Sequence, residues 1–274
     1  MRKRVMTESP DFPLRRAEDL RYVASADLEA LSVLRHYFLC RIGGFSSGKY
    51  ESLNFGSEGN GAECVQRNRN RAKECLGLNH PVLLAKQVHG DRIAIINEAN
   101  LEGMRAQPPE ADAMVTKLRD VPLGILTADC MVAVIFDKAT PALGIVHAGW
   151  RGIAMSIIWK TVLTMIDQFG TKSEDCYAAI GPGISAACYE VGEDVREALL
   201  QGLPFAEMIL EPAGELHWRA NLKEAAYRQL LDGRIPPRQV GVCPYCTHCE
   251  SDLFYSARRD GGDTGRQAAI ACIV

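Results

Sequence analysis

The sequence lacks an excess of either charge, a long apolar run and any internal repeat. Its 31 Lys and Arg residues against 34 Asp and Glu give a formal charge of −3, so no general basic field attracts nucleic acid or an anionic membrane. The most apolar stretch, residues 123–136, contains Asp129 and is shorter than the roughly 20 residues of a transmembrane helix. We therefore expect neither a nucleic-acid partner nor a membrane one.

The opening segment has no apolar stretch behind its basic residues. Met1-Arg-Lys-Arg4 is soon followed by the polar residues 7–11, where a secretory signal would need its apolar region. Without such a signal, the ten cysteines are expected to stay reduced, as apolar residues, metal ligands or nucleophiles. We expect a cytoplasmic protein in which residues 1–25 form an extended or poorly ordered lead-in and residues 26–274 form one domain.

Strand-like stretches outnumber helical ones and do not alternate with them regularly. This pattern favours an α+β layered fold over a doubly wound parallel sheet. The expected strands are residues 35–41, 82–88, 92–96, 113–116, 123–136, 142–147, 177–180, 239–243, 253–256 and 268–274. The expected helices are residues 63–76, ending at Gly77, residues 153–169, ending at Gly170, residues 193–201, and residues 222–231, with Asn221 as N-cap.

The densest chemical signal lies in residues 123–152, which are typical of a β-hairpin followed by a helix. A turn centred between residues 138 and 139 sets Cys130 opposite His147, with Cβ atoms roughly 5 Å apart. His89 follows the apolar run 82–88. A cysteine in an apolar strand is by itself more often inert packing. With two histidines it supplies the three ligands of a catalytic zinc site, whose fourth position is left for water or substrate.

Three arginines are candidates for binding an oxyanion. Arg151 lies in the turn Gly149-Trp-Arg-Gly152, where a strand passes into a helix and backbone N–H groups are free. Arg41 precedes two glycines, and Arg258 lies close to an expected strand end. A guanidinium can recognise phosphate with two parallel hydrogen bonds. Taken singly, each is equally well read as a solvated surface residue.

A series of short motifs closely resembles the laccase-domain protein family. That family is also called multicopper polyphenol oxidase, laccase-domain purine nucleoside phosphorylase and peptidoglycan editing factor. The resemblance implies a four-layer α-β-β-α sandwich with mixed sheets, and a metal site at His89, Cys130 and His147. The motifs run in order from about residue 35 to the end: Arg41-Ile-Gly-Gly44, Ser52-Leu-Asn-Phe-Gly56, Gln87-Val-His-Gly90, Ala111-Asp-Ala113, Thr127-Ala-Asp-Cys130, His147-Ala-Gly-Trp-Arg-Gly152, Ala179-Ile-Gly-Pro182, Tyr189-Glu-Val-Gly192, Cys246-Thr247, Phe254-Tyr-Ser256, Arg258-Arg-Asp260 and Thr264-Gly-Arg266.

The resemblance implies an enzyme that cleaves adenosine, inosine and methylthioadenosine with phosphate and also deaminates adenosine. On this hypothesis a zinc-bound water, with its pKa lowered toward neutrality, attacks C6 of adenine. Asp129 or Asp91 carries protons to the leaving ammonia. The residues assigned to phosphate and substrate binding are Arg41, Asn54, Arg151 and Arg258.

Other functions remain open on the same residues. Six histidines are too few for the trinuclear cluster of a full laccase, but a single copper ion in place of zinc would suit a polyphenol oxidase. A cysteine hydrolase acting on a peptidoglycan precursor would use Cys130 as nucleophile and His147 as base, with Asp91 or Asp129 orienting the imidazole. A binding module without turnover is the non-enzymatic alternative.

The segment 243–249 carries four further metal-ligating side chains. Cys243, Cys246, His248 and Cys249 lie within seven residues. Donors so closely spaced rarely surround a metal ion without a second pair from elsewhere in the chain. A thioredoxin-like redox motif is disfavoured, because the segment lies too near the end of the chain for that fold to follow.

Overall fold

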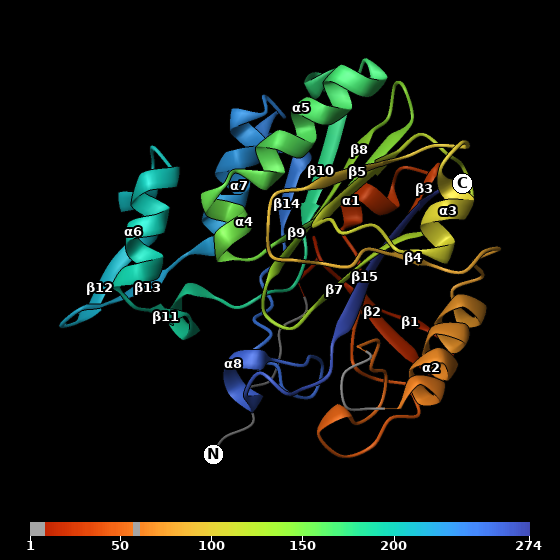
Figure 1. Ribbon diagram of the computed structural model, residues 1–274, viewed down its shortest axis with the longest axis horizontal. Helices are drawn as coiled ribbons and strands as arrows, with labels where there is room; N and C mark the ends of the chain where they lie inside the picture. The colour runs from red at the N-terminus through yellow and green to blue at the C-terminus, as the bar shows by residue number, and fades with distance from the viewer. Residues whose placement is uncertain (1–8, 57–60) are drawn as a thin grey trace.

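The computed structural model describes residues 9–56 and 61–274, which form two six-stranded sheets (Figure 1). Most neighbouring strands are antiparallel, whereas β4 and β7, β5 and β6, and β10 and β14 pair in parallel. In order, the first sheet contains β1 (Leu14–Ala17), β2 (Leu20–Val23), β3 (Leu34–Leu39), β15 (Gln267–Ile273), β7 (Leu123–Thr127) and β4 (Leu83–Leu84). The second contains β14 (Val240–Val242), β10 (Cys176–Ile180), β8 (Met131–Asp137), β9 (Ala142–Ala148), β6 (Ala113–Thr116) and β5 (Ile93–Ile96).

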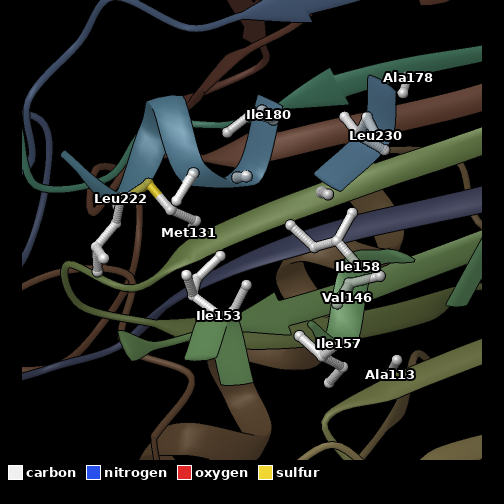
Figure 2. Packing of buried hydrophobic residues seen from close by; sticks show 14 of the residues in the cluster. Ala113, Met131, Val146, Ile153, Ile157, Ile158, Ala178, Ile180, Leu222 and Leu230 are labelled. Carbon is white, nitrogen blue, oxygen red and sulfur yellow. The ribbon is translucent and has the colours of Figure 1, made fainter. Parts of the chain in front are cut away.

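Helices cover the outer face of each sheet (Figure 1). On the first sheet, α2 (Ala62–Cys75) buries Ala72 beside Leu20, Leu39 and Ile270. On the second lie α4 (Trp150–Ala154), α5 (Ile157–Phe169), α6 (Glu193–Gly202) and α7 (Leu222–Asp232). Figure 2 shows Ile153, Ile158, Leu222 and Leu230 of these helices gathered over the sheet. The order is helix, sheet, sheet, helix, which confirms the predicted four-layer α+β fold.

The remaining described elements are short. The strands β11 (Glu190–Val191), β13 (His217–Ala220) and β12 (Leu210–Gly214) form a small third sheet. No helix among the described residues combines the length and the apolar character that crossing a bilayer requires. The other helices are α1 (Ala26–Glu29), α3 (Leu101–Ala106), α8 (Ala257–Asp260) and the 3₁₀ turns Gly48–Tyr50, Ser173–Asp175, Ala186–Cys188, Ala206–Ile209 and Pro237–Gln239.

The core between the two sheets explains why the central strands are apolar on both faces. Every residue of β8, β9 and β15 is buried. On β8, Val134 and Phe136 pack between the sheets, whereas Ala133 and Ile135 pack under the helices. A strand covered on both sides reads as a continuous apolar run rather than as an alternating one.

Two of the predicted elements are broken where the chain takes a left-handed backbone conformation. The strand expected over residues 123–136 divides into β7 and β8, which belong to different sheets, and Asp129 between them has φ of 97°. The helix expected over residues 153–169 divides into α4 and α5, and Ser156 between them has φ of 58°. Apolar periodicity does not detect either break, because the residues on both sides are buried.

The register of the β8–β9 hairpin also differs from the prediction. Val132, rather than Cys130, lies opposite His147. The Asp137 side chain accepts hydrogen bonds from the backbone N–H groups of Ala139 and Thr140, at 2.9 and 3.0 Å. This turn centres the hairpin one residue later than predicted and displaces each pair by two positions, so each side chain keeps its face.

Two predicted helix ends agree with the structure, whereas two predicted strands do not. The Asn221 side chain caps α7 by accepting a hydrogen bond from the Glu224 N–H at 3.1 Å, as predicted. Gly170 ends α5 with a left-handed backbone, as predicted. In contrast, of the predicted strand 82–88 only Leu83 and Leu84 form a strand, with Lys86 in an isolated bridge to Glu110, and residues 253–256 lead into α8 without forming a strand.

Two strands of the first sheet come from the lead-in expected over residues 1–25. β1 and β2 form a hairpin, and β2 pairs with β3. Leu20 and Val23 are completely buried. The boundary expected after residue 25 therefore does not separate this hairpin from the rest, and residues 1–8 lie outside the described residues.

Gly202 provides a test of the helix layer. A methyl group added there would lie 2.0 Å from the Ala154 carbonyl oxygen, in the backbone of α4. We expect Gly202→Ala to lower the free energy of unfolding by about 1–3 kcal/mol, because a backbone cannot yield as a flexible side chain does. Urea denaturation measures this, with Gly103→Ala as the control because nothing lies within 4 Å of that position. Equal midpoints for the two variants would contradict the packing.

Candidate metal centre

The three predicted ligands come together from three separate segments. His89 lies in the loop after β4, Cys130 in the crossing from β7 to β8, and His147 on β9. Their ligand atoms all lie within 4.8 Å of one another. The two imidazole rings are nearly perpendicular, with centroids 4.9 Å apart. The crossing at Asp129, rather than the predicted pairing of Cys130 with His147 across the hairpin, therefore brings Cys130 close to His147.

Asp112 holds the two histidines in place. Its Oδ1 lies 2.8 Å from His147 Nδ1, and both side chains are buried. The same carboxylate accepts the backbone N–H groups of Val88, His89 and Gly90 at 3.2, 3.0 and 2.8 Å. Burial alone would raise the pKa of Asp112, but His147 and these donors lower it. A carboxylate on Nδ1 directs the other ring nitrogen of His147 toward a metal.

Gly149 leaves room for the centre. A methyl group added at this position would lie 3.1 Å from Cys130 Sγ, 3.5 Å from His89 Cδ2 and 3.8 Å from His147 Cε1. The absence of a side chain thus keeps the space beside all three ligands open. Two imidazole nitrogens and one sulfur, with a free side left for a further ligand, suit zinc and also suit copper. The donor set therefore fits a metal of this class.

The electrostatics of the group favour the form of cysteine that binds metal. Burial raises the pKa of Cys130, but the opposite effect of His147 and His89 is larger and lowers this pKa to about 6. Burial lowers the pKa of His147, but Cys130 and Asp112 raise it to about 9. These opposite shifts favour a thiolate beside an imidazolium in the metal-free group. A cation held here would displace the imidazole proton and take the thiolate as a ligand.

The two carboxylates predicted to move protons are both engaged. Asp91 pairs with Lys160, with Oδ2 and Nζ 2.5 Å apart. Asp129 is buried, and its carboxylate holds the crossing between the sheets. It accepts three hydrogen bonds, from the Thr247 hydroxyl at 2.6 Å, the Ser256 hydroxyl at 3.0 Å and the Arg258 backbone N–H at 2.8 Å.

A cavity of about 340 Å³ borders the three ligands. This volume lies at the small end of the range typical of ligand pockets. Its wall includes Gln87, Thr127, Thr264 and Arg266. Sequence reasoning assigned no role to these residues or to Asp112, although Gln87, Thr127, Asp112, Thr264 and Arg266 all stand in the quoted motifs. Their presence in the family motifs was the signal by which these residues could have been predicted.

Two of the predicted phosphate-binding arginines gather around Tyr189. Arg258 lies over the Tyr189 ring, with Cζ 5.0 Å from its centroid, and Arg151 stacks on Trp150 at 4.2 Å. Burial raises the pKa of Tyr189, Cys130 raises it further, and Arg258 and Arg151 oppose that rise. Cys130 and both guanidinium groups are thus each within electrostatic reach of Tyr189.

Arg41 and Asn54 have other contacts. Arg41 lies 4.5 Å from the centroid of the Tyr255 ring and donates to the carbonyl oxygens of Ser251 and Glu51. Asn54 is completely buried. Its side chain bonds the backbone of Gly56 and Arg266, two residues of the cavity wall. Like Arg151 and Arg258, neither residue borders the cavity; Asn54 shapes its wall from behind.

Comparison with known proteins identifies the family. Residues 35–274 match the family described as "Multi-copper polyphenol oxidoreductase laccase", and the chain belongs to this family. A purine nucleoside phosphorylase of Bacteroides thetaiotaomicron is 35% identical over 258 residues, covering 91% of this chain and 95% of that protein. An adenosine deaminase of an unknown prokaryotic organism is 31% identical over 192 residues, covering 68% and 72%. The names of these relatives support an enzyme.

Solved structures share the fold. YlmD of Geobacillus stearothermophilus superposes with a TM-score of 0.87 at 30% identity, covering 96% of this chain and 98% of that one. The Bacillus licheniformis hypothetical protein YfiH superposes with a TM-score of 0.89 at 28% identity, covering 97% and 100%. The predicted family and fold are confirmed.

Gly149→Ala tests whether the open space beside the ligands matters for metal binding. We expect the added methyl group to press on Cys130 Sγ and weaken Zn²⁺ binding by roughly 10-fold or more, a loss comparable to that of an outer-shell partner. Competition with a chromophoric chelator measures the affinity. Gly103→Ala, in open space, is the control and should bind like the parent. Unchanged affinity in Gly149→Ala would show that the metal, if bound, lies elsewhere.

The lowered pKa of Cys130 predicts unusual reactivity in metal-free protein. Because the thiolate is populated above a pKa of about 6, alkylation of Cys130 by iodoacetamide should stay fast from pH 8 to 7 and fall only as the pH approaches 6. An ordinary thiol slows already below about pH 8.5. Peptide mapping by mass spectrometry follows each cysteine, and partly exposed Cys64 serves as the internal reference. Bound Zn²⁺ should protect Cys130; loss of reactivity already at pH 8 would contradict the ion pair.

Proposed function

We propose that the protein is a metal-dependent purine nucleoside phosphorylase, acting on adenosine, inosine and methylthioadenosine, and that it also deaminates adenosine. The observation that carries the proposal is that His89, Cys130 and His147 all border one cavity of about 340 Å³. A ligand in the cavity would therefore meet any cation that they hold. Relatives named purine nucleoside phosphorylase and adenosine deaminase support the substrate class.

We assign zinc to the centre, with copper as the alternative for the same donor set. Zn²⁺ bound there would supply a Lewis acid and a water molecule acidic enough to react near neutral pH. His147, fixed by Asp112, and Cys130, fixed through the crossing at Asp129, would keep the ligand geometry constant while substrates exchange. The buried hydrogen bonds of both carboxylates provide that rigidity.

Phosphorolysis requires phosphate to be held and oriented beside the ribose. Arg151 is exposed and stacks on Trp150 through the face of its guanidinium, so the N–H edges point away from the ring and can meet an oxyanion. Arg258 lies over the Tyr189 ring, and its Nη1 donates a hydrogen bond to the Glu190 carbonyl oxygen. We assign phosphate to Arg151 and Arg258 rather than to Arg41.

Deamination requires a proton for the leaving ammonia. Asp129 is poorly suited to that role, because both of its carboxylate oxygens already accept hydrogen bonds from other residues. Asp91 is half-buried, lies two residues from His89 and pairs with Lys160. We therefore assign the proton transfer to Asp91. The proposed partners are small molecules only, purine nucleoside and phosphate, and the proposed location is the cytoplasm.

A cysteine hydrolase is the second candidate. The pKa of Cys130, lowered to about 6 beside His147, is what an activated cysteine nucleophile would show. The carboxylate that orients His147 is Asp112, at 2.8 Å, and not Asp91 or Asp129. Metal separates the two functions: Zn²⁺ would occupy the thiolate and inhibit a hydrolase, whereas the proposed reactions require it.

Substitution of Cys130 tests the proposed function. Cys130→Ala should abolish phosphorolysis and deamination together, with losses beyond the roughly 10- to 100-fold expected for an outer-shell residue. Zn²⁺-loaded protein is incubated with adenosine, with and without phosphate, and adenine, inosine and hypoxanthine are separated by chromatography. Cys75→Ser, at the end of α2, is the matched control and should retain full rates. A Cys130→Ala protein that kept either reaction at the parent rate would refute the role of the metal group.

A further inference from the structure

A second cluster of metal-ligating side chains lies apart from the candidate centre and shares no residue with it. The ligand atoms of Cys188, His248 and Cys249 all lie within 4.8 Å of one another. Cys188 is the last residue of the 3₁₀ turn Ala186–Cys188, and the other two residues lie in the loop after β14. We propose that this cluster is a structural site for one Zn²⁺ ion, with Cys188, His248 and Cys249 as ligands and Cys246 in the fourth position.

The geometry resembles that of a tetrahedral zinc site. Zn–S bonds of about 2.3 Å place neighbouring sulfur ligands about 3.8 Å apart. The Sγ atoms of Cys188 and Cys249 are 3.4 Å apart, close to that separation and well beyond a disulfide bond of about 2.0 Å. Cys249 is exposed, and Cys188 and His248 are half-buried, so a cation can enter from solvent without unfolding.

Cys246 is the neighbouring thiol that would complete the set after its side chain rotates. Its side chain already interacts with that of Cys249, although its Sγ lies outside the group of ligand atoms within 4.8 Å of one another. Its Sγ also accepts the backbone N–H of Ser185 at 3.2 Å, and a hydrogen bond of this kind is a common support for a sulfur ligand. Cys243 is excluded, because it is completely buried in the apolar core between the sheets. The donor that segment 243–249 needed from elsewhere is therefore Cys188.

The site would fasten two loops that already touch. Gly183 and Cys246 form an isolated parallel bridge, and the Thr247 N–H donates to the Gly183 carbonyl oxygen at 3.2 Å. Arg259 clamps the second loop by donating to the carbonyl oxygens of Thr247 and His248, at 2.8 and 3.0 Å. A cation bound by ligands from both loops would lock this junction far more strongly than these hydrogen bonds do.

The junction is connected to the candidate centre by one short path. Thr247, between two of the proposed ligands, donates its hydroxyl to Asp129, which directly precedes Cys130. The ion at the second site would thus help to position the crossing between β7 and β8. None of its proposed ligands borders the cavity. Loss of the second ion should lower stability first and any activity only in part.

Metal stoichiometry of the full-length chain tests the proposal. Reduced, metal-stripped protein is titrated with Zn²⁺ and, in parallel, with Co²⁺, whose thiolate charge-transfer absorbance grows with the number of sulfur ligands. Cys130→Ser should bind one Zn²⁺ per chain, and Cys130→Ser with Cys249→Ser should bind none. The Co²⁺ spectrum of Cys130→Ser should report more than one thiolate. Cys64→Ser, outside both clusters, is the control and should bind as many ions as the parent.

The variants also separate this proposal from the proposed enzymatic function. Because Cys130→Ser removes a ligand of the first centre, its remaining ion reports on the second site whether or not the protein has any phosphorolytic activity. Zn²⁺ should raise the thermal midpoint of Cys130→Ser and leave that of the double variant unchanged. Circular dichroism confirms that each variant is folded, and Cys188→Ser provides an independent second variant.

Two results would overturn the second site. One is a Cys130→Ser protein that binds no Zn²⁺, or that still binds one ion after Cys249→Ser or Cys188→Ser is added. The other is a disulfide between Cys188 and Cys249, seen as the loss of two hydrogens by mass, in protein purified without oxidant and free of metal. That pair of thiols would then be a redox site and not a zinc site.

Discussion

The hydrogen bonds of one buried carboxylate, that of Asp112, organise the candidate centre. An ionised carboxylate removed from water is costly unless hydrogen bonds compensate it. Here the compensation comes from His147 and from three consecutive backbone N–H groups at residues 88–90. Those groups converge only when the His89 loop folds back over the end of β9. The stability of the carboxylate and the geometry of the two imidazoles are thus a single constraint.

A second carboxylate, that of Asp129, does the same for the sulfur ligand. The chain leaves one sheet and enters the other at this residue, and its left-handed backbone costs on the order of 1 kcal/mol or more for a residue other than glycine. Hydrogen bonds from Thr247, Ser256 and Arg258 offset that cost. Residues far apart in the sequence therefore fix Cys130, and Gly149 leaves the remaining space open.

The parts of the molecule that the sequence predicts are those that local pattern or motif can specify. The apolar runs, the Asn221 cap and the family motifs led to the four layers and to His89, Cys130 and His147. The register of β8 and β9 was wrong by two positions, because it depends on a side-chain turn at Asp137. The break at Asp129 and the role of Asp112 were missed, because their partners lie 22 to 129 residues away in the chain. Cys188 escaped notice for the same reason.

The shortness of β4 has a consequence for local opening of the first sheet. Only Leu83 and Leu84 pair in it, through parallel bonds to β7 at the rim of the first sheet. Detachment of these two residues from β7 would break few ladder bonds, so the free energy of opening β4 should be far smaller than that of global unfolding. The His89 loop would stay attached meanwhile, because its hydrogen bonds to Asp112 do not involve β4. Because β4 is a short edge strand, it also exposes few backbone groups to which a strand of another chain could pair, and this protects against aggregation through the sheet edge.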